Sequence, residues 1–117
     1  MSLVSPPYRT AWAVNYWAPG FWHDFFRELD AAVRATGPVT ATSWWRSPTH
    51  NAEVGGNRDS QHLIGTAVDL VTEEPDQLAR ELARFGWITV NEGDHLHVQA
   101  WPAGVARAVG LLDALGL

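Results

Sequence analysis

The absence of cysteine limits how this chain can be held together more than any other feature of its sequence. With 117 residues, the chain is long enough for one domain with one core and too short for two. Disulfide bonds, thiolate metal sites and cysteine nucleophiles are all excluded. The fold must therefore depend on apolar burial, for which 46% hydrophobic residues and seven tryptophans suffice, or on a metal held by histidine and carboxylate.

The charge balance excludes several classes of partner. The formal net charge is −5, and every cation is an arginine because the sequence contains no lysine. Binding to nucleic acid needs a basic surface that displaces counterions, and none is visible. The same balance argues against electrostatic docking on anionic membranes. No stretch approaches the roughly 20 apolar residues of a transmembrane helix, so we expect no membrane insertion.

The N-terminus carries no recognisable export signal. It reads Met-Ser-Leu-Val-Ser-Pro-Pro and lacks a charged segment followed by an apolar one. We therefore expect a soluble protein that is synthesised in the cytoplasm. We also expect it to be a monomer.

Two segments have the apolar spacing of amphipathic helices. The first runs from Phe21 to about Ala35 and is stopped by Gly37-Pro38. The second begins at Pro75, which suits a first helical turn, and ends at Gly86. A short C-terminal helix is indicated by the spacing of Val105, Val109 and Leu112.

Four short segments predict β-strands, and they are Val39–Trp45, Thr66–Val71, Trp87–Asn91 and His95–Ala100. Residues 47–57 predict a loop or one short helix, because they are polar and contain proline and glycine. Residues 1–20 combine prolines with aromatics and predict an irregular arm packed on the core. The chain is therefore expected to form one α+β domain over residues 1–117, with a small antiparallel sheet and two to three flanking helices.

Histidines and acids form an informative pattern in the second half of the chain. His62 and Asp69 lie seven residues apart, the histidine in the polar loop and the aspartate in the following strand. His95 and His97 lie two apart on the last strand, where such residues point to the same face. Two histidines, one carboxylate and one open water position would suit a catalytic zinc ion. Either motif alone is common by chance, however, and such residues also form solvated polar edges.

A longer pattern resembles a known family. It comprises Ser43-Trp44-Trp45-Arg46-Ser47-Pro48-Thr49-His50-Asn51, Val54-Gly55-Gly56, and Ser60-x-His62-x-x-Gly65-x-Ala67-x-Asp69, and it resumes at Asp94–Val98. This pattern covers about a third of the chain and is similar to the signature of the M15 peptidase family. That family contains D-Ala-D-Ala carboxypeptidases and dipeptidases, L-alanyl-D-glutamate endolysins of phages and related murein endopeptidases. The resemblance implies the zinc peptidase fold that this family shares with hedgehog domains.

The resemblance also implies a ligand set and a general base. His62, Asp69 and His97 match the family's ligands for one zinc ion per chain. The family's base is a Glu or Asp three residues before the last ligand, which is Asp94 here. Glu92, at the same turn, is a second candidate, and the register favours Asp94.

Three more residues match positions with roles in the family. His95 stands beside the metal in relatives without binding it, and is a candidate for stabilising the oxyanion. Arg46 matches an arginine that polarises or anchors the substrate, although it could instead form an ion pair with Asp59 or Glu53. Ser60 matches a residue that contacts the substrate, although it could equally cap a helix or turn.

The activity implied is zinc-dependent hydrolysis of peptidoglycan stem peptides, as a carboxypeptidase or an endopeptidase (endolysin). An alternative is a non-catalytic, zinc-stabilised module of the same fold that binds the cell wall or belongs to a virion. A third reading is a zinc-stabilised interaction domain, as in the hedgehog group. The size and the missing export signal fit a phage or prophage enzyme acting on the cell wall, and equally a fragment of a larger protein.

Overall fold

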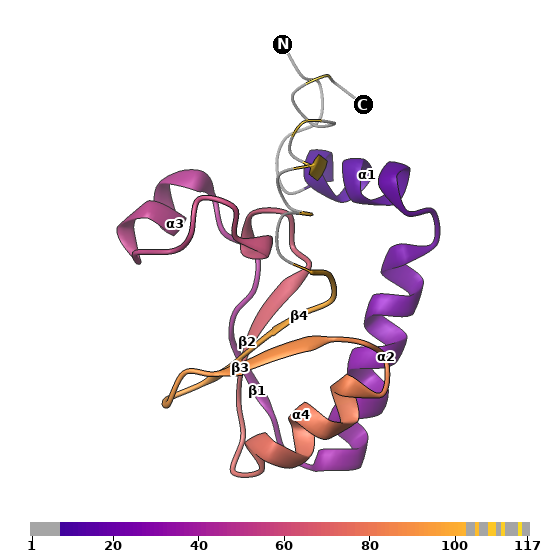
Figure 1. Cartoon of the computed structure of the whole chain (residues 1–117), viewed down its shortest axis with the longest axis vertical. Coiled ribbons are helices and arrows are strands. Elements are labelled where there is room, and N and C mark those ends of the chain that lie inside the picture. Colours follow the sequence, from indigo (N-terminus) through magenta and orange to yellow (C-terminus); the bar gives the residue numbers. More distant parts are fainter. Residues whose placement is uncertain (1–7, 103–104, 106–107, 110, 112–114, 116–117) are drawn as a thin grey trace.

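A four-stranded antiparallel sheet forms the centre of the fold (Figure 1). In the computed structural model its strands are β1 (Thr40–Ser43), β2 (Ala67–Val71), β3 (Ile88–Asn91) and β4 (Leu96–Gln99). Their spatial order is β1-β2-β4-β3, so β2 and β4 are the two central strands. The structure describes residues 8–102, 105, 108–109, 111 and 115.

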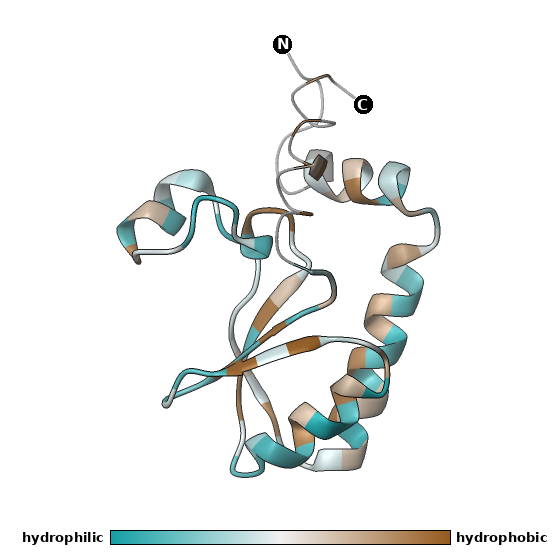
Figure 2. Ribbon diagram, in the orientation of Figure 1, coloured by the Kyte–Doolittle hydropathy of each residue, from teal (hydrophilic) through white to brown (hydrophobic). Residues whose placement is uncertain are grey.

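Two helices, α2 (Phe21–Thr36) and α4 (Pro75–Ala83), pack on each other and cover one face of the sheet (Figure 1). Hydrophobic and hydrophilic residues alternate in bands along α2, as expected of a helix with one buried face (Figure 2). The helices and the sheet share one core, which includes Phe25, Leu78, Leu82, Val68, Leu70, Leu96 and Val98. The helix α2 ends at Gly37, whose φ of 115° suits glycine.

The opposite face of the central strands is polar. Side chains alternate along a strand, so the neighbours of the core residues point away from the helices. On β2 this places Asp69 between Val68 and Leu70, and on β4 it places His97 between Leu96 and Val98. The alternation that builds the core thus also directs the Asp69 carboxylate and the His97 imidazole to the opposite, polar face of the sheet.

The N-terminal segment corrects one expectation. Residues 1–20 were expected to form an irregular arm, but Tyr8–Trp17 is a helix, α1. The prolines lie at positions 6, 7 and 19, so they flank this helix and do not interrupt it. Ala13 and Val14 are fully buried, which anchors α1 on the core. Residues 1–7 lie outside the described part of the chain.

The remaining elements agree with the α+β expectation. The helices expected at Phe21 and Pro75 and all four strands are present, with ends that differ by at most three residues. The polar segment after β1 contains one short helix, α3 (Pro48–Glu53), and a 3₁₀ turn, η1 (Gln61–Leu63). The expected C-terminal helix falls partly outside the described residues, among which Val105 and Val109 are helical. None of the helices in the described ranges is long and apolar enough to cross a membrane.

Candidate metal centre

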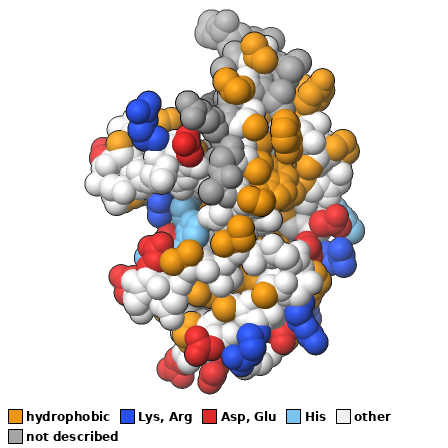
Figure 3. Space-filling view, viewed as in Figure 1, with side chains coloured by type: hydrophobic (Ala, Val, Ile, Leu, Met, Phe, Trp, Pro, Cys, Tyr) orange, Lys and Arg blue, Asp and Glu red, His pale blue; other side chains and the backbone are white. Residues whose placement is uncertain are grey.

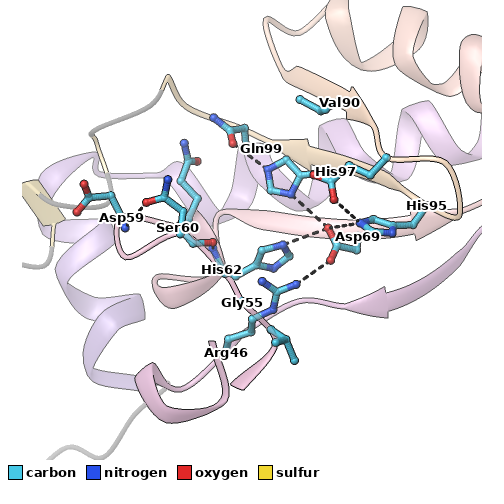
Figure 4. A pocket seen from close by; sticks show the side chains of 15 residues that line it. Arg46, Gly55, Asp59, Ser60, His62, Asp69, Val90, His95, His97 and Gln99 are labelled. Atoms are coloured by element: carbon cyan, nitrogen blue, oxygen red, sulfur yellow. Dashed lines mark hydrogen bonds and ion pairs between the residues drawn. The ribbon is translucent and has the colours of Figure 1, made fainter. Parts of the chain in front are cut away.

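Three side chains converge on one point above the polar face of the sheet (Figure 4). Asp69 Oδ1 lies 3.1 Å from His62 Nε2 and 3.2 Å from His97 Nδ1. One nitrogen or oxygen atom from each residue can be chosen so that all three lie within 4.8 Å of one another. Two imidazoles and one carboxylate at this spacing are a donor set that fits a divalent metal such as zinc.

The sheet register places two of these residues. Asp69 on β2 is directly opposite His97 on β4, in the pairing that also joins Val68 to Val98. Directly opposed side chains on one face have Cβ atoms about 5 Å apart, which is close enough for both to reach one ion. The register that aligns the core therefore also aligns the two ligand candidates.

The third residue, His62, is held by the chain that follows β1. Its backbone carbonyl accepts a hydrogen bond from Arg46 N at 2.9 Å, and its ring Nδ1 lies 2.6 Å from the carbonyl oxygen of Trp44. The turn after η1 requires Gly65, which has a φ of 78°. A Cβ atom at that position would lie 2.7 Å from the ring of Trp45. His62 is 1% exposed, so these contacts leave it little freedom.

The outer nitrogens of both imidazoles have acceptors. The carbonyl oxygen of Trp44 can only accept, so His62 Nδ1 donates to it, and Nε2 is the ring nitrogen that faces Asp69. His97 Nε2 lies 2.8 Å from Gln99 Oε1, and donation there leaves His97 Nδ1 facing Asp69. Histidines that bind metals usually donate their second N–H in this way. The contacts around the imidazoles therefore also fit a metal site.

Arg46 is bound to the second oxygen of the same carboxylate. Its Nη2 donates to Asp69 Oδ2 at 2.9 Å, and its side chain is 14% exposed. The other two nitrogens of the guanidinium, Nε and Nη1, donate to Ser43 Oγ and Asn51 Oδ1. The ion pair is thus with Asp69 and not with Asp59 or Glu53. It fixes Oδ2 and leaves Oδ1 directed at the two histidines.

The ionisation of this cluster follows from its contacts. Burial alone would raise the pKa of Asp69, but hydrogen bonds with His62 and His97 outweigh it and hold the pKa well below its usual range. The hydrogen bond to Asp69 raises the pKa of His97, against the opposing effect of burial. The carboxylate is therefore ionised at neutral pH, as a metal ligand must be.

These residues lie at the bottom of an open groove of about 680 Å³. One wall is the segment from Val54 to Gln61, and the other carries Val90 and Glu92. The space-filling view shows histidine side chains in a recess between the α3 segment and the rest of the molecule (Figure 3). A peptide-sized ligand could therefore reach the three converging side chains from solvent.

The two candidate bases lie on opposite sides of the His95 imidazole. Glu92 Oε2 is 3.1 Å from His95 Nε2, the nitrogen that faces Asp69 Oδ1 at 3.8 Å. Asp94 Oδ1 is 2.6 Å from the other ring nitrogen, and the Asp94 side chain is 88% exposed. Glu92 lines the groove, whereas Asp94 does not. The two carboxylates are separated by Gly93, whose φ is 95°.

Ser60 lies at the rim of the groove and caps η1. Its Oγ accepts a hydrogen bond from His62 N at 3.2 Å. The capping interpretation of this serine is confirmed. Its hydroxyl hydrogen stays available to a ligand, because the cap uses the oxygen only as an acceptor.

Comparison with known proteins decides the family. A family model described as Peptidase M15 matches residues 23–99, which is more than half of the chain. The chain belongs to the M15 peptidase family. M15 peptidases are metallopeptidases, so the protein is assigned as a hydrolase of this kind. No curated protein and no solved structure matches the chain.

Two residues of this M15 peptidase centre were not predicted from the sequence. Gln99 contacts the outer nitrogen of His97, and Gln61 precedes His62 and is 3% exposed. The period of two along β4 could have placed Gln99 on the face of His97. No sequence signal distinguishes Gln61 from an ordinary surface glutamine.

Removing the metal from this M15 peptidase should reverse the dependence of its stability on pH. The raised pKa of His97 contributes stability below the unfolded value near 6.5, and this is lost as pH rises through the higher folded value. A bound metal requires the deprotonated ring, so metal binding strengthens over the same range. Melting temperatures from about pH 6 to about pH 9 should fall with pH in chelator and rise with pH in added zinc.

The size of this effect should be large at the alkaline end. Zinc at a thousandfold excess over its Kd adds about 4 kcal/mol to the stability of the folded state. Two melting curves that respond to pH in parallel would contradict the exchange of a proton on His97 for a metal ion.

Proposed function

We propose that this M15 peptidase hydrolyses peptide bonds in the stem peptides of bacterial peptidoglycan, with one zinc ion held by His62, Asp69 and His97. The observation that carries the proposal is the convergence of these three side chains, within 4.8 Å of one another, at the bottom of an open groove. When bound there, zinc supplies a water molecule with a pKa near 7 and polarises the scissile carbonyl.

The remaining steps belong to the chain's own residues. Glu92 lines the groove on the metal side of His95, so its carboxylate can take a proton from the attacking water and pass it to the leaving amine. His95 Nε2 lies between Glu92 and Asp69, where a protonated ring can donate a hydrogen bond to the tetrahedral oxyanion. These positions support Glu92, and not Asp94, as the general base.

Arg46 is assigned a different part from the one that the family resemblance implies. Its guanidinium is committed to Asp69, Ser43 and Asn51 and is largely shielded from solvent. In this arrangement Arg46 keeps the Asp69 carboxylate oriented, with Oδ1 toward the metal. The substrate is then contacted by the opposite wall, where Ser60 and the backbone from Gly55 to Asn57 border the groove.

The test of this function is digestion of purified peptidoglycan sacculi by protein loaded with one equivalent of zinc. Mass spectrometry of the released material should show new amino and carboxyl termini within stem peptides and no new sugar ends. Loss of a single terminal residue would identify a carboxypeptidase, and longer fragments an endopeptidase. The matched control is the same preparation in chelator, which should release nothing. Folded, zinc-loaded protein that cuts no sacculus would favour a non-catalytic wall-binding module.

A further inference from the structure

Gln99 connects one ligand candidate to the backbone beyond the sheet. It lies two residues after His97 on β4, and the two side chains share the face that borders the groove. Its Oε1 is 2.8 Å from His97 Nε2, and its Nε2 donates to the carbonyl oxygen of Trp101 at 2.8 Å. One amide therefore spans from the imidazole to the main chain.

The Trp101 backbone is itself fixed by Gln61, a buried glutamine next to His62. The Gln61 amide nitrogen donates to the carbonyl oxygens of Trp101 and Pro102. Its oxygen accepts from Thr66 Oγ1 at 2.9 Å and from Trp101 N at 3.2 Å. All four hydrogen-bonding positions of this amide are used, so the Trp101 peptide has one position relative to η1.

These contacts determine the orientation of the Gln99 amide. A backbone carbonyl can only accept, so the NH₂ group of Gln99 must face Trp101 and its oxygen must face His97. The oxygen in turn requires a proton on His97 Nε2. The opposite ring nitrogen, Nδ1, is then the one without a proton when the imidazole is neutral, and it is the one that faces Asp69.

We propose that Gln99 is a positioning residue for the metal centre, held in place by Gln61 through the Trp101 backbone. The pair of glutamines joins η1, which carries His62, to the end of β4, which carries His97. Gln99 thus holds the ring angle of His97 and accepts the proton of Nε2, which leaves Nδ1 as the ring nitrogen directed toward a metal. The inference rests on the metal site of the proposed function, but it does not depend on which peptide is cut.

The first test is the affinity for zinc, measured by competition with a chromophoric chelator. Residues that orient metal-binding histidines typically contribute 10–100-fold in metal affinity. Gln99→Leu removes the acceptor and should weaken zinc binding by about this factor. Gln99→Glu keeps an acceptor for the Nε2 proton but loses the donor to the Trp101 carbonyl, so it should weaken zinc binding less than Gln99→Leu does. The matched control is Gln77→Leu, a glutamine on α4 that donates to the carbonyl of Ala35 outside the groove and should change nothing.

The second test separates positioning from simple support of the fold. In zinc-loaded protein with ¹⁵N-labelled histidine, the His97 Nε2 proton should be protected from exchange by Gln99. This resonance should disappear in Gln99→Leu and persist in Gln99→Glu, while the melting temperatures of the zinc-free proteins stay similar. If Gln99→Leu does not fold, Gln99→Met removes the same acceptor with a flexible side chain of similar length.

Two results would overturn the inference. One is zinc binding by Gln99→Leu or Gln99→Met within threefold of the unchanged protein, and the other is an Nε2 proton that exchanges equally fast with and without Gln99. If sacculi are cut normally but the Gln99 variants bind zinc as tightly as the unchanged protein, only the inference fails. If zinc affinity depends on Gln99 but no sacculus is cut, the inference holds and the proposed function fails.

Discussion

Replacing His62 with alanine is expected to remove zinc and peptidase activity together. His62 contributes one of the three converging donor atoms, and it is 1% exposed. Two remaining ligands cannot complete a tetrahedral site with one open position. Zinc content after dialysis, measured by mass spectrometry of the metal, should fall from stoichiometric to trace, and hydrolysis of sacculi should fall to the level of the zinc-free protein.

The matched control for this variant is His23→Ala. His23 lies on α2 with its side chain 80% exposed, and within the described part of the chain its ion pair is with its neighbour Asp24. This control should keep full zinc and full activity. A His62→Ala protein that retained zinc after dialysis would show that the ligand set is wrong. Its melting temperature should be compared with that of the zinc-free parent, because both lack the metal.

Glu92→Gln should lower kcat by about 10²–10⁴-fold and leave zinc in place, because a general base is not a ligand. The amide keeps the shape of the side chain and removes its ability to accept a proton. Asp94→Asn should lower kcat less than about tenfold, because that carboxylate is exposed and bonds to the ring nitrogen of His95 that faces away from the site.

Both variants should be measured side by side on the same stem-peptide substrate, with zinc content determined for each. The reverse ranking would return the role of base to Asp94, as the sequence register suggested. Two mild effects would instead point to His95, or to a site that binds zinc without doing chemistry. Zinc loss in Glu92→Gln would place Glu92 among the ligands.

The sequence was a good guide to those parts of the fold that depend on local periodicity. The helix α2 was predicted because its apolar residues recur at helical spacing, and Gly37 ends it. The strands β2 and β4 were predicted because apolar and polar side chains alternate, and the same alternation directs Asp69 and His97 outward. The prolines of residues 1–20 predict irregular structure, but they only flank α1, so composition alone does not reveal this helix.

The site was harder to predict wherever geometry depends on contacts between distant segments. The resemblance to the M15 signature selected His62, Asp69 and His97, which the fold does bring together, although their binding of metal stays a prediction. The choice between Glu92 and Asp94 depends on how the turn at Gly93 closes, and residue order does not give that direction. The partner of Arg46 is Asp69, 23 residues away, and proximity in sequence pointed to Asp59 or Glu53 instead.

The glutamines illustrate the same limit more sharply. The Gln61 side chain forms hydrogen bonds with Trp101, 40 residues further along the chain. The atoms of Trp101 that it contacts are backbone atoms, which every residue possesses. No pattern of side-chain types records such a contact. Amides that orient metal ligands therefore become visible only when the main chain around them is known.

The two walls of the groove differ in how they could diverge during evolution. The ligand candidates Asp69 and His97 lie on strands whose opposite side is the core, so a change that shifts this pairing would disrupt the packing and separate the two side chains at once. The facing wall, Val54 to Ser60, is a surface segment that contributes no ligand. New substrate preferences could therefore arise by changing residues 54–60 while the catalytic half stays constant. Libraries randomised in that segment, which leave the sheet untouched, are the natural starting point for redirecting the enzyme to other peptides.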